Sequence, residues 1–181
     1  MQPQAATPQH HTQRPQTPER PQRALRNEEI EAYRRDGVVC LRQVVPPHWM
    51  EKIRAGVLRA IHHPSPFSRL TSSPNSGYNM ELFLWKRDDD LRDVIFGSSL
   101  AHLARDLMGA DHIHFFYDQL FAKKSGTTTP TPWHHDLTFW PLAGDQICSM
   151  WIPIQAVTRE SSGLEFIAGS HRWTNRWKAV G

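Results

Sequence analysis

Cysteine is scarce in this sequence of 181 residues, and long hydrophobic runs are missing from it. The two cysteines, Cys40 and Cys148, lack the close spacing of metal or redox motifs, so we expect two reduced, half-buried thiols and no disulfide framework. No apolar stretch is long enough to cross a bilayer, and the N-terminus lacks the apolar segment of a secretory signal. We therefore expect a cytoplasmic protein with no membrane partner.

Excess charge is also missing from most of the chain. The formal net charge of the whole chain is +3, and residues 1–26 alone account for it, with four arginines against one glutamate (Arg14, Arg20, Arg23, Arg26 and Glu19). The rest of the chain therefore sums to zero, which does not support a basic face for nucleic acid. Residues 1–26 also lack aromatic side chains that could stack on bases. We expect no nucleic-acid partner.

The first 26 residues are rich in Gln, Pro, Thr and Arg and contain almost no side chains that a core could bury. Such a composition is typical of disorder. The sequence therefore predicts a disordered tail over residues 1–26 and one folded domain over residues 27–181.

Helix signals lie in the first part of that domain. The segment from Asn27 begins with acidic residues and ends at Gly37, and the segment after Pro47 repeats apolar residues at helical spacing. A short acidic segment and a longer apolar one follow, the latter with Ser98 as its cap and Gly109 as its end. The predicted helices span residues 27–37, 48–61, 88–97 and 99–108.

Strand-like segments dominate the second part. Apolar and β-branched residues cluster in short runs separated by turn-rich pieces such as "SGTTTPTP" and "TRESSG". Residues 64–80 are expected to form a long loop, which is often a lid or a binding loop. This order of helices first and a mostly antiparallel sheet second indicates an α+β fold. The predicted strands span residues 38–45, 81–85, 112–124, 146–157 and 164–170.

The segment "TPWHHDLTFW", residues 131–140, holds two histidines and an aspartate in consecutive positions. If it is a strand, His134 and Asp136 share one face and His135 points to the other. Together they offer one imidazole nitrogen and one carboxylate oxygen, two of the three ligands in the 2-His-1-carboxylate set that holds non-haem Fe(II). An H-x-D pattern alone also arises by chance.

The wider sequence resembles a known family. The motifs "DGVVCLRQVVPP", "DQLFAKKSG", "TPWHHDLTFW", "WIP", "SSGLEF" and "GSHRW" resemble, in content and order, those of the phytanoyl-CoA dioxygenase family of Fe(II)- and 2-oxoglutarate-dependent oxygenases. The resemblance runs from about residue 27 to the end. It implies a double-stranded β-helix, a jelly-roll or cupin-like barrel, with N-terminal helices packed outside it.

The resemblance also implies roles for individual residues. His134 and Asp136 match the first two iron ligands, and Thr131 matches a position where relatives place a side chain against 2-oxoglutarate. Lys123 and Trp151 lie on segments that flank the site in the family and are weaker candidates for the lining of the cosubstrate pocket. Each of these last three has an ordinary alternative, as a loop hydroxyl, a solvated charge and a core side chain respectively. Family members often have glutamine at the position of His135, whose imidazole would lie near the metal or outside the sheet.

The third iron-binding histidine and the arginine that binds the far carboxylate of 2-oxoglutarate come, in the family, from strands after the "GSHRW" motif. No residue up to Gly181 matches either position. Arg172 and Arg176 do not match the arginine, and the resemblance gives His171 a role in holding a turn. We therefore expect an incomplete barrel, either the N-terminal part of a complete oxygenase or a chain that lacks activity.

The function implied is hydroxylation of an unactivated C–H bond in a small organic substrate, with O2 consumed and succinate and CO2 as co-products. The loop at 64–80, Phe139 and Trp140 are candidates for substrate contact. The alternative is a truncated, inactive half-barrel that acts only as a binding module. A cupin-like zinc or nickel enzyme is less favoured, because a carboxylate stands where a second histidine would be expected. Neither the substrate nor the oligomeric state follows from these residues.

Overall fold

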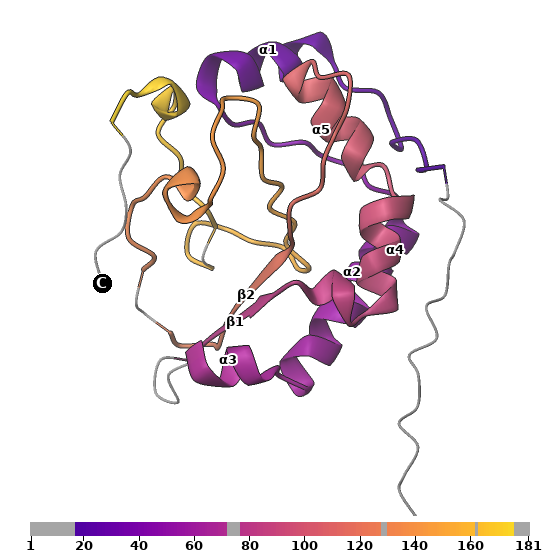
Figure 1. Cartoon of the computed structure of the whole chain (residues 1–181), viewed down its shortest axis with the longest axis vertical. Coiled ribbons are helices and arrows are strands. Elements are labelled where there is room, and N and C mark those ends of the chain that lie inside the picture. The colour runs from indigo at the N-terminus through magenta and orange to yellow at the C-terminus, as the bar shows by residue number, and fades with distance from the viewer. Residues whose placement is uncertain (1–16, 72–76, 128–129, 162, 176–181) are drawn as a thin grey trace, which may run out of the picture.

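The computed structural model describes residues 17–71, 77–127, 130–161 and 163–175. Figure 1 shows the helices in an arc around one side of the molecule, with the later, mostly irregular chain running across its inner side. The α-helices are α1 (Asn27–Asp36), α2 (Pro47–His62), α3 (Pro66–Thr71), α4 (Asp89–Gly97) and α5 (Leu100–Met108). The strands are β1 (Tyr78–Leu82) and β2 (Gln119–Lys123), and the 3-10 helices are η1 (Leu84–Lys86), η2 (Asp136–Phe139) and η3 (Ser170–Arg172).

The four predicted helices are confirmed, because their end signals are local. Gly37 and Gly109 both adopt left-handed backbone angles, φ 77° and 63°, and end α1 and α5. The predicted cap of α5 is wrong by one residue: the N-cap is Ser99, whose side chain makes no capping hydrogen bond, and Ser98 ends α4, although its Oγ accepts the N–H of Leu100 at 3.3 Å. At the start of α1 the N-cap is Arg26 rather than Asn27, and Glu29 accepts the Arg26 N–H.

The core lies where α2 packs against α4. One cluster joins Trp49, Ile53 and Val57 of α2 to Val94 of α4, and a second contains Ala60, Leu84 and Leu91. Gly56 lets the two helices approach closely, since a Cβ there would lie 2.5 Å from the Leu91 Cγ. Ion pairs from Lys52 to Asp93 and from Arg59 to Asp90 of α4 connect the same helices at the surface.

Most of the predicted strands are wrong for the described residues. The only strands there are β1 and β2, which pair antiparallel with Tyr78 opposite Lys123 and Leu82 opposite Gln119. The predicted strand at 112–124 is confirmed only over β2, and the one at 81–85 overlaps β1 at two residues. The segments at 38–45, 146–157 and 164–170 run without ladder partners, and a strand exists only where a neighbouring strand pairs with it.

The predicted loop at 64–80 is partly wrong as well. It contains α3 and the start of β1, while its residues 72–76 lie outside the described part of the chain. A buried carboxylate fixes α3 to the sheet: Glu81, 2% exposed, accepts hydrogen bonds from the N–H and Oγ of Ser65 at 2.8 and 2.6 Å. Arg87 pairs with the same carboxylate at 2.6 Å.

Residues 17–26, which belong to the tail expected to be disordered, make polar contacts with the helices. The Arg23 guanidinium donates to both carboxylate oxygens of Glu29 at 2.8 and 2.7 Å and to the Arg42 carbonyl. The Glu19 carboxylate accepts the Trp49 indole N–H at 2.7 Å. Residues 1–16 of the expected tail lie outside the described residues. Polar anchors therefore order a segment that has little apolar surface to bury.

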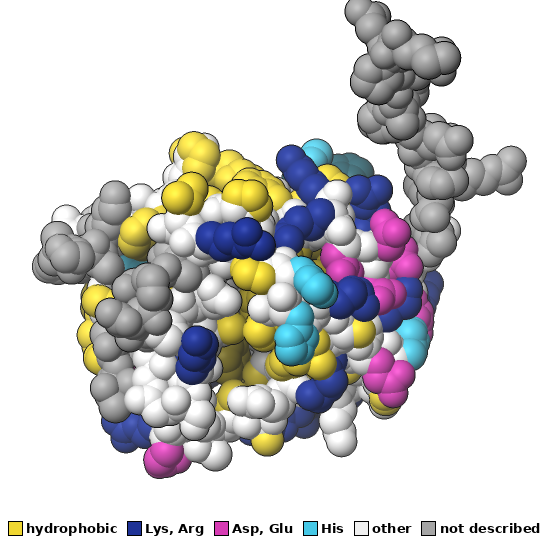
Figure 2. Space-filling view, turned by 90° about the horizontal axis from the view of Figure 1, so that it is seen from below, with side chains coloured by type: hydrophobic (Ala, Val, Ile, Leu, Met, Phe, Trp, Pro, Cys, Tyr) yellow, Lys and Arg dark blue, Asp and Glu magenta, His cyan; other side chains and the backbone are white. Residues whose placement is uncertain are grey.

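Large apolar side chains of the later chain are exposed. Among residues 130–175, examples are Trp133 at 60%, Phe166 at 59% and Phe139 at 50%. Figure 2 shows hydrophobic side chains gathered in the hollow at the middle of this face. The described residues contain no helix long and apolar enough to span a membrane.

Candidate metal centre

Residues 131–140 pass from extended backbone into the 3-10 helix η2. His135 is the N-cap of η2 in an extended conformation, and Asp136 is its first residue. The prediction that His134 and Asp136 lie on a strand is therefore wrong. Their side chains nevertheless meet, with Nε2 of His134 3.2 Å from Oδ1 of Asp136, while the His135 imidazole contacts Ser170.

The His134 imidazole is held in one tautomer. Its Nδ1 lies 2.8 Å from the Pro132 carbonyl oxygen, which can only accept, so Nδ1 carries a hydrogen. The edge-on ring of Phe139, 5.3 Å away between centroids, packs beside it. In the neutral imidazole Nε2 then holds a lone pair that faces a carboxylate oxygen, and two such acceptors need a proton or a cation between them.

Asp136 is also oriented. Its Oδ1 faces His134, whereas its Oδ2 accepts a hydrogen bond from Ser149 Oγ at 3.2 Å. Metal–ligand bonds of about 2.1 Å that meet at a right angle place two donor atoms about 3 Å apart. The separation of Nε2 and Oδ1 fits that spacing. Side-chain exposure of 26% for His134 and 52% for Asp136 leaves the pair open to solvent and ligands.

A third donor is not supplied by the described residues, among which no group of three His, Cys, Asp or Glu side chains converges. Nε2 of His135 lies 3.3 Å from the Ser170 carbonyl, and its ring packs edge-on to Trp173 at 5.9 Å. His171 lies against Gly37, and the Gly169 N–H donates to the Asp36 carbonyl at 2.7 Å. The pair of donors fits two corners of an iron site.

Comparison with protein families matches residues 33–180 to the model described as phytanoyl-CoA dioxygenase. The chain belongs to the phytanoyl-CoA dioxygenase family. No curated protein and no solved structure matches the sequence. The family is one of oxygenases with a jelly-roll fold, and the matched residues include the end of α1, the later helices and the His134–Asp136 pair. In the described residues the sheet has two strands and is not closed.

The three positions that the family resemblance assigns to the cosubstrate lie on different segments. Lys123 ends β2, Thr131 is exposed three residues before His134, and Trp151 is 45% exposed. Trp151 therefore belongs to neither core cluster, contrary to its core alternative. The roles of these residues toward 2-oxoglutarate stay predictions.

Aromatic side chains gather next to the candidate centre. The Trp140 indole N–H donates to the Tyr117 hydroxyl at 2.8 Å, and Tyr117 stacks edge-on with Phe116 at 4.9 Å. Trp140 was a predicted substrate contact, but Tyr117 and Ser149 were missed. Their contacts join residues 23 and 13 positions apart, so no local pattern could reveal them.

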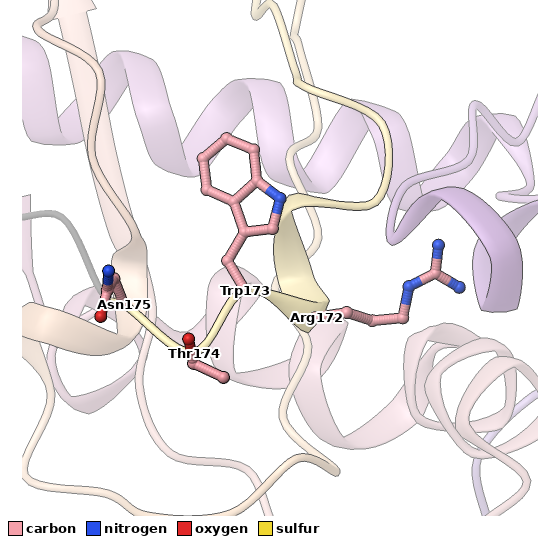
Figure 3. A pocket seen from close by; sticks show the side chains of 4 residues that line it. All are labelled: Arg172, Trp173, Thr174 and Asn175. Atoms are coloured by element: carbon pink, nitrogen blue, oxygen red, sulfur yellow. The ribbon is translucent and has the colours of Figure 1, made fainter.

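Two surface pockets lie near the family's "GSHRW" motif. One is lined by Arg172, Trp173, Thr174 and Asn175, and Figure 3 shows the side chains of Arg172 and Trp173 pointing in different directions. The other lies between α1, α5 and residues 145–147 and is lined partly by Tyr33 and His171.

Burial, together with the neighbouring Cys148, raises the pKa of Tyr33 to about 12, and burial raises the pKa of the Cys148 thiol. Cys40, expected to be half-buried, is exposed.

Proposed function

We propose that this chain is an Fe(II)- and 2-oxoglutarate-dependent dioxygenase that hydroxylates an unactivated C–H bond of a small organic substrate. The observation that carries the proposal is the His134–Asp136 pair, whose Nε2 and Oδ1 lie 3.2 Å apart within a phytanoyl-CoA dioxygenase sequence. The Pro132 carbonyl leaves the Nε2 lone pair available, as metal-binding histidines require.

His134 and Asp136 would hold the iron, and each residue has a partner that fixes its donor atom. Pro132 fixes the imidazole and Ser149 the carboxylate. With 2-oxoglutarate and O2, bound Fe(II) supplies the oxidising power that converts C–H to C–OH, releasing succinate and CO2. A facial set of three protein ligands leaves room for the cosubstrate, and the described residues supply two of the three.

The remaining parts of the proposal concern binding. A lysine and a hydroxyl, Lys123 and Thr131, are suited to a dicarboxylate, and Trp151 offers an indole face and an N–H. Phe139 and Trp140 would contact the substrate, because both lie on or next to η2, directly after the metal ligands. Phe139 is half exposed and also packs on His134, so one side chain contacts the candidate ligand and remains open to solvent.

Anaerobic titration with Fe(II), and with Co(II) as a spectroscopic substitute, tests the proposal. We expect the wild type to bind one ion and the His134→Ala/Asp136→Ala variant to lose that binding. His135→Ala is the matched control, because the imidazole of His135 contacts Ser170 and not Asp136. This variant should bind the metal ion as the wild type does. Equal binding by the double variant would refute the assignment. A wild type without metal binding would favour the alternative of an inactive half-barrel that acts as a binding module.

A further inference from the structure

We propose that Ser149 is a positioning residue that makes Asp136 bind the metal through one oxygen only. This inference rests on the proposed function. Ser149 lies between Cys148 and Met150, in a segment without regular secondary structure, 13 residues after the aspartate that it contacts. The H-x-D motif contains no signal for this partner.

The two carboxylate oxygens of Asp136 have different environments. Oδ1 lies 3.2 Å from Nε2 of His134, and Oδ2 lies 3.2 Å from Oγ of Ser149. An ionised carboxylate only accepts hydrogen bonds, so the Ser149 hydroxyl is the donor. Its proton is directed at Oδ2, and the lone pairs of Oδ1 are left for the cation beside His134.

Because the two oxygens of Asp136 have different partners, the carboxylate should fill one coordination position of the metal and not two. A carboxylate whose two oxygens are equally available can bind a cation through both. A hydrogen bond to Oδ2 favours attachment through Oδ1 alone and keeps the group from rotating about its terminal bond. One position that a two-oxygen attachment would fill then stays open for a cosubstrate or for water.

The contact also links two separate parts of the chain. Residues 146–150 precede the "WIP" segment, and Ile152 and Ile154 pack on the core cluster of Trp49, Ile53, Val57 and Val94. Ser149 is therefore three residues from a side chain fixed by the helical arc. The hydroxyl gives the exposed Asp136 a partner whose backbone is anchored to that core.

Three variants test the role. Ser149→Ala removes the hydroxyl, Ser149→Thr keeps it, and Ser125→Ala removes an exposed hydroxyl elsewhere on the surface. Because Ser149 is itself exposed, we expect all three to fold like the wild type by far-UV circular dichroism and thermal unfolding. The Kd for Co(II) and the visible absorption of bound Co(II) are then measured for each protein.

Loss of the partner of a metal ligand typically weakens metal binding by about 10- to 100-fold. We expect Ser149→Ala to raise the Kd for Co(II) about 10-fold and to shift the absorption bands, as one more oxygen enters the coordination shell. Ser149→Thr and Ser125→Ala should retain the wild-type Kd and bands. If Ser149→Ala retains both, the inference is overturned while the proposed function stands. A wild type that binds no Co(II) would overturn both.

Discussion

The imidazole of His171 lies directly over Gly37, the residue that ends α1. A Cβ at Gly37 would overlap Nδ1 of that ring, and the backbone of Gly37 has a φ of 77°. Beside this contact the Gly169 N–H donates to the Asp36 carbonyl at 2.7 Å. The first helix of the domain is thus joined to the "GSHRW" motif near the other end of the sequence.

Gly37→Ala should therefore lower the free energy of unfolding by about 2–4 kcal/mol, from left-handed strain and overpacking together. In a His171→Ala background the same change should cost about 1–2 kcal/mol, because the overlap with the ring is gone, and the left-handed strain and a 3.0 Å contact with the retained Cβ of residue 171 are left. Urea unfolding of the four proteins of this cycle measures the coupling. Equal costs in both backgrounds would show that the two residues do not touch in solution.

Glu29 should make stability depend on pH. Hydrogen bonds from the Arg23 guanidinium, and next from Arg26, hold the pKa of this carboxyl well below its usual value of about 4.3. A carboxyl with a lowered folded pKa contributes stability that is present above the unfolded pKa and is lost as pH falls toward the folded one. The melting temperature should therefore drop as pH falls below about 4.5.

Glu29→Gln should flatten this part of the pH profile and lower the melting temperature at pH 7. Glu28→Gln changes the exposed neighbouring carboxylate and serves as the control, with a profile like that of the wild type. Thermal unfolding followed by circular dichroism between pH 3 and 7 provides the comparison. If Glu29→Gln has the same pH profile as the wild type, the contacts of Glu29 with Arg23 and Arg26 are not the source of the pH dependence.

Arg87→Met should destabilise the attachment of α3 to β1. It removes the cation that pairs with the carboxylate of Glu81, 2% exposed, and leaves the hydrogen bonds from Ser65 in place. Breaking one side of a buried ion pair costs about 3 kcal/mol. Arg69→Met, on the exposed side of α3, should change the free energy of unfolding by no more than about 0.5 kcal/mol. Urea unfolding of the two variants distinguishes these outcomes.

Residues 1–181 alone should not turn over 2-oxoglutarate. The described residues bring together two donors, His134 and Asp136, and no group of three. The arginine that anchors 2-oxoglutarate in the family also has no match among the 181 residues. Succinate measured with Fe(II), ascorbate, O2 and 2-oxoglutarate should not exceed that of a metal-free control. Succinate formation abolished by His134→Ala would show that these residues assemble a working centre by themselves.

The sequence by itself determined the helices and the two candidate ligands. Helix ends depend on residues within one turn, so Gly37 and Gly109 could be interpreted without any knowledge of the fold. His134 and Asp136 are separated by one residue, and either an extended strand or the start of a 3-10 turn brings their side chains together. The H-x-D pattern alone did not identify these two residues as metal ligands, and the resemblance of the wider motifs to the family supplied that prediction.

Only the tertiary structure decided which apolar segments became strands and how the candidate ligands are held. A β-strand needs a partner that the local sequence does not name, so residues 146–157 resemble a strand yet run unpaired. The contact between Arg23 and the buried carboxylate of Glu29 on α1 was likewise not evident from composition. The hydrogen bond from Ser149 to Asp136 is of the same kind. It depends on the relative positions of two distant segments, one of which packs on the helical core through Ile152 and Ile154.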